Sequence, residues 1–181
     1  MIDNAAPRTR VLGTLGSADG VGVVRIEDRY EIDPNGLWSA ITDPRRLARW
    51  YGEVEGDLPA GQFNVFLEAA GSHAVGRVKL CEPPLRLAVV TRETDESWQR
   101  SGGMPPFDQT LEATLTADGD QTVLVIEAHG MPLDKIAFYG VGWQIHAENL
   151  AGYLAGCKPG DTEARWDELV PRYQELAATM G

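Results

Sequence analysis

The chain has 181 residues, of which 43% are hydrophobic and 24% are charged, as in an ordinary soluble globular protein. A chain of this length forms one domain without needing a metal or disulfide staple. The composition excludes wholesale disorder, collagen-like repetition and a membrane bundle. The 27 Asp and Glu residues outnumber the 16 Lys and Arg residues, for a formal charge of −11. Such a charge repels phosphate backbones and anionic lipids, so we expect neither a nucleic acid nor a membrane as partner.

The first 19 residues are rich in glycine and show no clear period, and we expect them to form an extension that pairs at most weakly with a sheet edge. Arg8 and Arg10 are not followed by an apolar run, so no secretory signal is predicted. The longest uncharged stretch, Ile136 to Ala147, is too short to span a bilayer. Cys81 and Cys157 are interpreted as free thiols. Together these features predict a cytoplasmic protein.

The first predicted strand covers residues 21–32, where β-branched residues follow a period of two. Val24, Ile26 and Tyr30 share one face of this strand with Asp28. A carboxyl on an apolar face indicates either a buried group with a partner or a bulge that shifts the register.

Two short helices are predicted next. Asp33-Pro34 and Asp43-Pro44 each place an N-cap aspartate before a proline at the first helical position. The two helices together carry the apolar residues Leu37, Trp38, Ile41, Leu47, Trp50 and Tyr51.

Six further strands are predicted between Gly52 and His129, with short turns between most of them. Such short connections favour antiparallel pairing of neighbours, and Asp118-Gly119 suits a tight hairpin. The polar segment 95–106 interrupts this rhythm and is predicted to be a loop that carries Trp98. The strands are expected at 52–57, 62–69, 73–81, 85–93, 108–117 and 121–129.

A helical period begins after Pro132. A long amphipathic helix is predicted to end at Gly156, and its glycines each cost about 1 kcal/mol of helix stability relative to alanine. Small residues can also let the helix backbone approach its neighbours closely. A terminal helix follows, and Pro171 near its middle is predicted to kink or restart it. The apolar face of the long helix is formed by Tyr139, Trp143, Ala147, Leu150 and Leu154, and its glycines are Gly140, Gly142 and Gly152.

The order of these elements predicts an α+β fold. A single antiparallel sheet of about seven strands would curl round the long helix, which is the one element large enough to cover its apolar face. The short helices and the 95–106 loop would close one end of the space between the two. We divide the chain into an N-terminal extension (1–19), one domain (20–156) and an additional C-terminal helix (157–181) packed on the same domain.

Several motifs follow one another in an order that is typical of one superfamily. They are Trp38-Ser-Ala-Ile-Thr-Asp-Pro-Arg-Arg-Leu-Ala-Arg-Trp50-Tyr, Gly52-Glu-Val-Glu-Gly-Asp-Leu58, Gly76-Arg-Val, Cys81-Glu-Pro-Pro84-Leu-Arg-Leu87, Leu115-Thr-Ala-Asp-Gly119 and Gly142-Trp143 with Leu150 and Leu154. In these motifs the chain resembles the START-like helix-grip superfamily SRPBCC, and within it the homologues of the activator of the heat-shock protein ninety ATPase. The resemblance covers about residues 20–156 and implies a helix-grip fold with a cavity between sheet and long helix. It implies no single activity, because members include lipid carriers, polyketide cyclases and aromatases, hormone receptors and co-chaperone domains.

Candidate site residues are those expected to line the implied cavity. His146, about one turn after Trp143, would offer a hydrogen bond or an acid–base group to a ligand, or it is a half-exposed helix histidine. Asp28 would orient a ligand, or it forms an ion pair with Arg25, Arg29 or Arg77. The aromatic residues at helical spacing are also typical of an ordinary core. The predicted ligand-binding set is Trp50, Tyr51, Phe66, Trp98, Tyr139, Trp143 and His146.

No metal or cofactor is expected. The histidines and cysteines show no close ligand pair. Gly140-x-Gly142 lacks the third glycine and the preceding strand of a dinucleotide site, and neither a nucleophile elbow nor a P-loop occurs.

Three functions remain open from the sequence. The first is a binding protein for a small hydrophobic molecule. The second is an enzyme similar to the polyketide cyclases and aromatases, with His146 and Asp28 as the acid–base pair. The third is a co-chaperone-like or other partner-binding domain. Trp166 and Tyr173 of the terminal helix would either pack on their own domain or form a homodimer contact.

Overall fold

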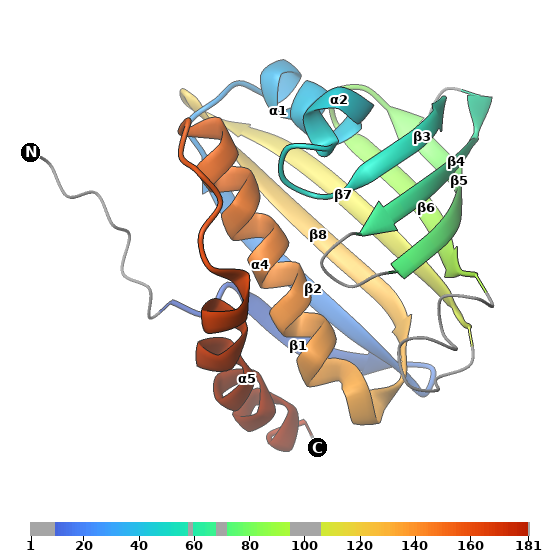
Figure 1. Ribbon diagram of the computed structural model, residues 1–181, viewed down its shortest axis with the longest axis vertical. Helices are drawn as coiled ribbons and strands as arrows, with labels where there is room; N and C mark the ends of the chain where they lie inside the picture. The colour runs from blue at the N-terminus through green and yellow to red at the C-terminus, as the bar shows by residue number, and fades with distance from the viewer. Residues whose placement is uncertain (1–9, 58–59, 68–71, 95–105, 181) are drawn as a thin grey trace, which may run out of the picture.

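The computed structural model describes residues 10–57, 60–67, 72–94 and 106–180. These residues form one antiparallel sheet crossed by a long helix, with two short helices at one end (Figure 1). This is the predicted α+β helix-grip architecture. None of the described helices is long and apolar enough to cross a membrane.

The sheet has eight strands in the order β1-β2-β8-β7-β6-β5-β4-β3. Seven of them occupy the predicted positions, and the eighth is β1, within the segment expected to be an extension. It pairs with β2 in regular register from Gly13 opposite Ile26 to Ala18 opposite Val21. The strands are β1 Gly13–Ala18, β2 Val21–Tyr30, β3 Glu53–Asp57, β4 Gln62–Leu67, β5 Ser72–Glu82, β6 Arg86–Glu93, β7 Asp108–Asp118 and β8 Gln121–Met131.

The two short helices begin as their Asp-Pro signals predict. In α1 (Pro34–Thr42) the carboxylate of Asp33 accepts a hydrogen bond from the backbone N–H of Gly36 at 2.8 Å. In α2 (Pro44–Leu47) the carboxylate of Asp43 accepts one from the N–H of Arg45 at 2.9 Å. These caps satisfy backbone donors that have no partner within a helix.

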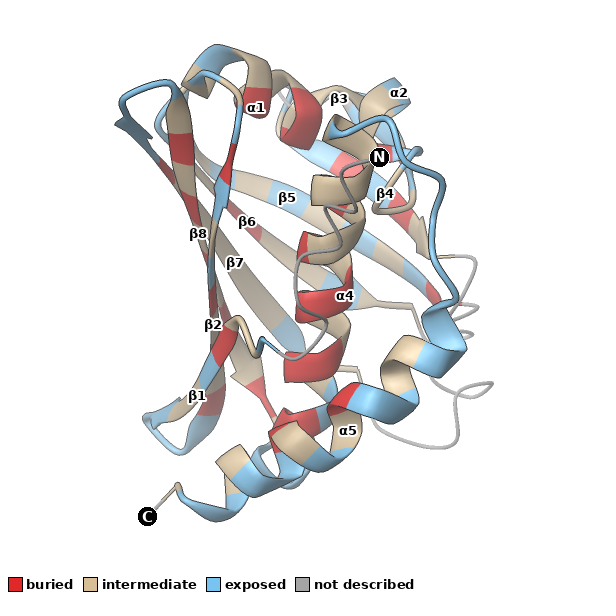
Figure 2. Ribbon diagram, turned by 90° about the vertical axis from the view of Figure 1, so that its left-hand side faces the viewer, coloured by how far each residue is buried: buried red, intermediate tan, exposed pale blue. Residues whose placement is uncertain are grey.

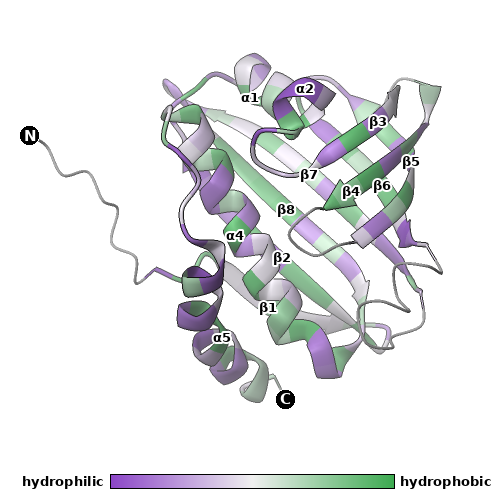
Figure 3. Ribbon diagram, in the orientation of Figure 1, coloured by the Kyte–Doolittle hydropathy of each residue, from purple (hydrophilic) through white to green (hydrophobic). Residues whose placement is uncertain are grey.

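The long helix α4 (Ile136–Leu154) follows a short 3-10 turn, η3 (Leu133–Lys135), and crosses the inner face of the sheet against β1 and β2. Figure 3 shows hydrophobic segments on β2 and β8, beneath this helix. Val24 and Ile26 of β2 and Ala128 of β8 are buried there with Ala147 of α4. This packing forms the main core.

The terminal helix α5 (Thr162–Ala178) crosses α4 at an angle and packs against its N-terminal half (Figure 2). It continues through Pro171 without a restart. Leu169 and Tyr173 of α5 are buried against Val141 and Ile145 of α4. Most of its other residues face solvent, and Pro171, which removes one backbone donor from the helix, is among them.

A buried polar side chain joins α4, α5 and the segment before β1. Gln144 is fully buried, and its Oε1 accepts hydrogen bonds from the Leu12 backbone N–H at 3.0 Å and from the Tyr173 hydroxyl at 2.7 Å. Its Nε2 donates to the Arg10 carbonyl and to Glu148, each at 2.9 Å. All four hydrogen-bonding positions of the amide are therefore used.

Candidate functional site

An apolar cavity of about 100 Å³ lies between the sheet and the helices. The strands contribute mainly valine, leucine and phenylalanine side chains from β3, β4, β6, β7 and β8. Thr91 and Glu112 are the two residues of the lining that are neither aliphatic nor aromatic. The remaining wall consists of Ile41 from α1, Leu47 from α2, Trp50 and Tyr51 from the turn after α2, and Trp143 from α4.

Three aromatic rings form the helical side of this cavity. The ring centroids of Trp50 and Tyr51 are 5.6 Å apart, and Tyr51 stacks on Trp143 at 6.3 Å with an interplanar angle of 21°. The indole N–H of Trp50 donates to the carbonyl of Ala40 at 3.0 Å, which fixes this ring against α1. The chain thus brings together three residues of the predicted ligand-binding set.

His146 lies next to these rings without being part of the cavity lining. Its ring centroid is 4.8 Å from that of Tyr51 and 5.5 Å from that of Trp143. Its Nδ1 atom is buried and has no hydrogen-bond partner. Burial lowers the pKa of His146 to about 4, because a charged imidazolium is poorly solvated there. The imidazole is therefore neutral at pH 7.

Asp28 stays on the inner face of β2 with Ile26 and Tyr30, since the irregularity in this strand falls at Gly22 and Val23. It is half-buried, and burial raises its pKa, opposed by a hydrogen bond from the Arg29 backbone N–H at 2.9 Å. Its carboxylate forms no ion pair within the described part of the chain. Arg25 pairs instead with Glu27, and the Arg29 side chain pairs with Asp118.

The structure does not bring Asp28 and His146 into one site. Asp28 does not line the cavity, and its carboxylate accepts a hydrogen bond from within its own strand, at the Arg29 backbone N–H. His146 instead contacts Tyr51 and Trp143. The geometry therefore gives no support to this pair acting together as acid and base.

The other predicted ligand-binding residues lie elsewhere. Phe66 is on the outer face of β4, where its ring packs on His73 at a centroid distance of 4.4 Å. Tyr139 packs edge-on against Phe107 at 5.8 Å, outside the cavity lining. Burial raises the pKa of Tyr139 to about 12. Trp98 falls outside the described residues.

Sequence reasoning missed the strand residues of the cavity wall. Phe63 and Val65 of β4 face inward, as do Leu87 and Val89 of β6. The period-two alternation within 62–69 and 85–93 carried a signal for them.

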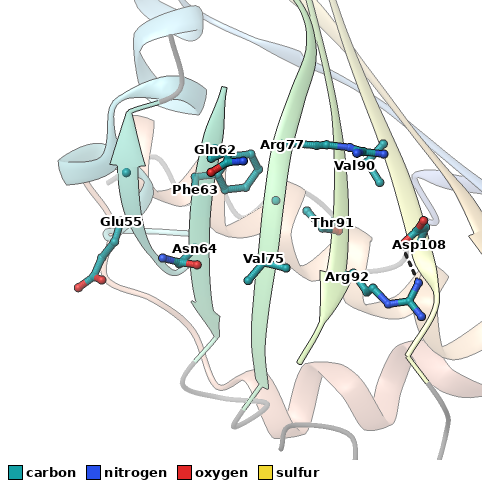
Figure 4. A pocket seen from close by; sticks show the side chains of 12 residues that line it. Glu55, Gln62, Phe63, Asn64, Val75, Arg77, Val90, Thr91, Arg92 and Asp108 are labelled. Atoms are coloured by element: carbon teal, nitrogen blue, oxygen red, sulfur yellow. Dashed lines mark hydrogen bonds and ion pairs between the residues drawn. The ribbon is translucent and has the colours of Figure 1, made fainter. Parts of the chain in front are cut away.

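A second hollow of about 540 Å³ lies on the outer face of the sheet, across β3 to β7 (Figure 4). Its wall includes polar side chains such as Gln62, Asn64 and Arg77. Arg92 and Asp108 form an ion pair across it at 3.0 Å, and both side chains are more than half exposed. Exposed pairs of this kind contribute little energy. The apolar cavity between the sheet and the helices is therefore the stronger candidate for a ligand site.

Comparisons with known proteins agree with this architecture. The crystal structure of CalU16 from Micromonospora echinospora is similar with a TM-score of 0.71 and 27% identity, covering 92% of this chain and 98% of CalU16. DynU16, a protein of the dynemicin biosynthetic locus, gives a TM-score of 0.64 and 27% identity over 78% of this chain and 49% of DynU16. Protein MLL2253 from Mesorhizobium loti shares the fold, with a TM-score of 0.64 and 22% identity over 74% of this chain and 96% of that protein.

A search of curated proteins gave no significant match. The family model described as activator of Hsp90 ATPase homolog 1-like protein matches residues 31–155. This range contains α1, α2, strands β3 to β8 and α4, so it includes every element that contributes to the cavity. The resemblance identified in the sequence is confirmed, and the chain belongs to the activator of Hsp90 ATPase homolog 1-like family.

Proposed function

We propose that this protein binds a small apolar molecule in the cavity bounded by Trp50, Tyr51 and Trp143. The observation that carries the proposal is the apolar space between helix and sheet, with three aromatic rings on one side. Aromatic walls offer large contact areas to a flat apolar ligand. The fold is that of a ligand-binding domain, which supports a small molecule as the occupant.

The size of the cavity limits what it can hold. Ligand pockets commonly measure about 300–1,000 Å³, whereas this one measures about 100 Å³. An apolar cavity of about 150 Å³ in another protein holds benzene. We therefore propose a single small ring, or the apolar end of a larger molecule, as the group that enters.

The relatives support a small natural compound over a macromolecular partner. DynU16 belongs to a biosynthetic locus, and CalU16 is similar to this chain over nearly its whole length. Binding at the inner cavity accounts for the apolar lining without requiring any catalytic group.

Thermal unfolding in the presence of indole and toluene tests this function. A ligand that binds the folded state at ten times its Kd stabilises it by about 1.4 kcal/mol, which raises Tm by about 3–6 °C in a protein of this size. Ala113, on the cavity wall, allows a blocking variant. Ala113→Leu adds three carbon atoms to the lining and should abolish the Tm shift while the protein stays folded.

Ala117→Leu is the matched control, because Ala117 lies on the same face of β7 and is exposed. It should keep the full ligand-induced shift. The absence of any shift in the wild type would contradict the proposal, as would an equal shift in both variants.

A further inference from the structure

We infer that His146 is the polar recognition group of the cavity and that the Tyr51 ring is the movable wall in front of it, so that the ligand is a small aromatic molecule bearing a hydroxyl group. This inference rests on the proposed function and specifies its ligand class. It starts from one unsatisfied atom. Among the residues that the structure describes, Nδ1 of His146 is the one buried side-chain nitrogen or oxygen without a hydrogen-bond partner.

Such an atom requires an explanation, because native proteins pair nearly all of their buried polar groups. The contrast with Gln144 on the same helix is direct, since every polar position of that buried amide is paired. The residues packed around α4 can therefore supply hydrogen-bond partners to a buried side chain that has a structural role. A ligand group would complete the hydrogen bond that His146 lacks.

The position of His146 makes a ligand the suitable partner. Its ring packs on Tyr51 and Trp143, and both of these line the cavity. His146 is therefore separated from the cavity by the thickness of one aromatic layer. Thr91 and Glu112, the lining residues that are neither aliphatic nor aromatic, come from strands β6 and β7, whereas His146 lies behind the helical side of the wall.

Tyr51 is the part of that wall best placed to move. It lies in the turn between α2 and β3, outside any helix or strand, whereas Trp143 is held within α4. Trp50 is fixed by its hydrogen bond to Ala40. Rotation of the Tyr51 side chain would enlarge a cavity that is small for a ligand, and the same rotation would expose Nδ1 of His146 to it.

The chemistry of the imidazole determines which group it recognises. The ring is neutral at pH 7, since burial lowers its pKa to about 4. With the proton on Nε2, the bare Nδ1 accepts a hydrogen bond. A phenolic hydroxyl donates such a bond while its ring occupies the apolar space beside Trp143.

Phenol and toluene form the matched pair of probes, since they have the same ring and one further heavy atom each. The Kd of each is measured by NMR titration of the wild type, of His146→Phe and of His73→Phe. His73 lies on the outer face of the sheet, so the latter variant controls for the substitution itself. The ratio of the toluene Kd to the phenol Kd should fall about tenfold in His146→Phe and stay unchanged in His73→Phe.

A second measurement on the wild type does not depend on the folding of a variant. Phenol should shift the ¹⁵N resonance of His146 Nδ1 and remove the nuclear Overhauser effect between the rings of Tyr51 and His146, whereas toluene should leave the ¹⁵N resonance in place. If both probes bind but neither the ratio nor the resonance responds, the inference is overturned and the proposed function stands. If neither probe binds the wild type, the proposed function fails and the inference fails with it.

Discussion

His146 and Gln144 lie two residues apart on α4 but differ in their hydrogen bonding. The amide of Gln144 connects three segments through four hydrogen bonds. The imidazole of His146 is enclosed by two aromatic rings and keeps an unpaired nitrogen. The amide contributes to structure, whereas the imidazole lowers stability in the absence of a ligand, because its desolvation is not offset by a hydrogen bond.

The burial of His146 predicts a pH dependence of folding. Its pKa is about 4 in the folded protein and about 6.5 in an unfolded chain. Between these values the unfolded chain binds a proton that the folded protein does not, so stability falls as the pH falls from about 6.5 to about 4. The difference between the two pKa values corresponds to about 3 kcal/mol.

Urea unfolding of the wild type and of His146→Phe between pH 7 and pH 4 measures this dependence. The wild type should lose up to about 3 kcal/mol relative to the variant over this range. Asp28, whose pKa is raised by burial, contributes with the opposite sign, but it is present in both proteins and cancels in the difference. A difference that stays constant with pH would show that the imidazole is not held neutral in the folded state.

At the residue scale, sequence reasoning found the helical side of the site and missed the strand side. Trp50 and Tyr51 directly follow α2, and Trp143 lies on α4, so the helical pattern of the sequence predicted all three. Phe66 faces outward although it was expected at the site; Val65, Phe66 and Leu67 are three apolar residues in a row, and such a run does not reveal its register. The orphaned nitrogen of His146 depends on atomic packing, which a residue pattern does not contain.

Two glycines of α4 differ in how closely neighbouring side chains approach them. The sequence predicted a cost in helix stability or a close approach to a neighbour, and the structure distinguishes them. A Cβ on Gly140 would lie 2.5 Å from the Tyr173 ring, whereas one on Gly152 would have its nearest neighbour, Cys157, at 3.9 Å. Gly140 is therefore required for α5 to dock, and Gly152 is not.

Alanine substitutions at these two glycines test the distinction. Gly140→Ala should lower the free energy of unfolding by about 1–3 kcal/mol, because the added methyl group overpacks the contact. The Tyr173 ring has little freedom to yield, since its hydroxyl bonds to Gln144 at 2.7 Å. Gly152→Ala, the matched control, should raise the same quantity by up to about 1 kcal/mol through helix propensity. Denaturant unfolding measures both, and effects of the same sign would contradict the interpretation.

Element prediction succeeded where local chemistry was explicit. The Asp-Pro starts of α1 and α2 and the Asp118-Gly119 hairpin all formed as predicted. The same Asp-Gly signal occurs at Asp19-Gly20, where both residues adopt positive φ between β1 and β2. This signal alone does not predict a hairpin, because the short, glycine-rich β1 shows no hydrophobic alternation of its own.

At the scale of the whole molecule, the cavity follows from a mismatch of dimensions. Eight strands about 4.8 Å apart span about 34 Å, whereas a helix with its side chains is about 10–12 Å wide. One helix therefore cannot cover the inner face of this sheet, even when the sheet curls. α4 covers β1, β2 and β8, and the space over β3 to β7 is left mainly to α1, α2 and the cavity.

Because α4 covers only part of the sheet, the strands are predicted to differ in their local stability against opening. β5 and β8 are both 11-residue strands with a neighbour on each side, so their backbone hydrogen bonding is matched. Inward residues of β8, such as Thr122, Leu124 and Ala128, are at most 2% exposed, whereas Ser72 is the one buried residue on β5. Local opening should therefore be easier at β5, because fewer apolar contacts are lost there.

Hydrogen exchange followed by mass spectrometry tests this directly. Peptides from β5 should exchange at least about tenfold faster than peptides from β8, and a cavity ligand should slow exchange in β4 and β6, whose side chains line the site, more than in β8. Equal protection of β5 and β8 without a ligand would mean that the sheet opens as one unit. In that case the strands around the cavity would be as stable against local opening as the strands beneath α4. The movement required of Tyr51 would then have to occur without local opening of the strands around it.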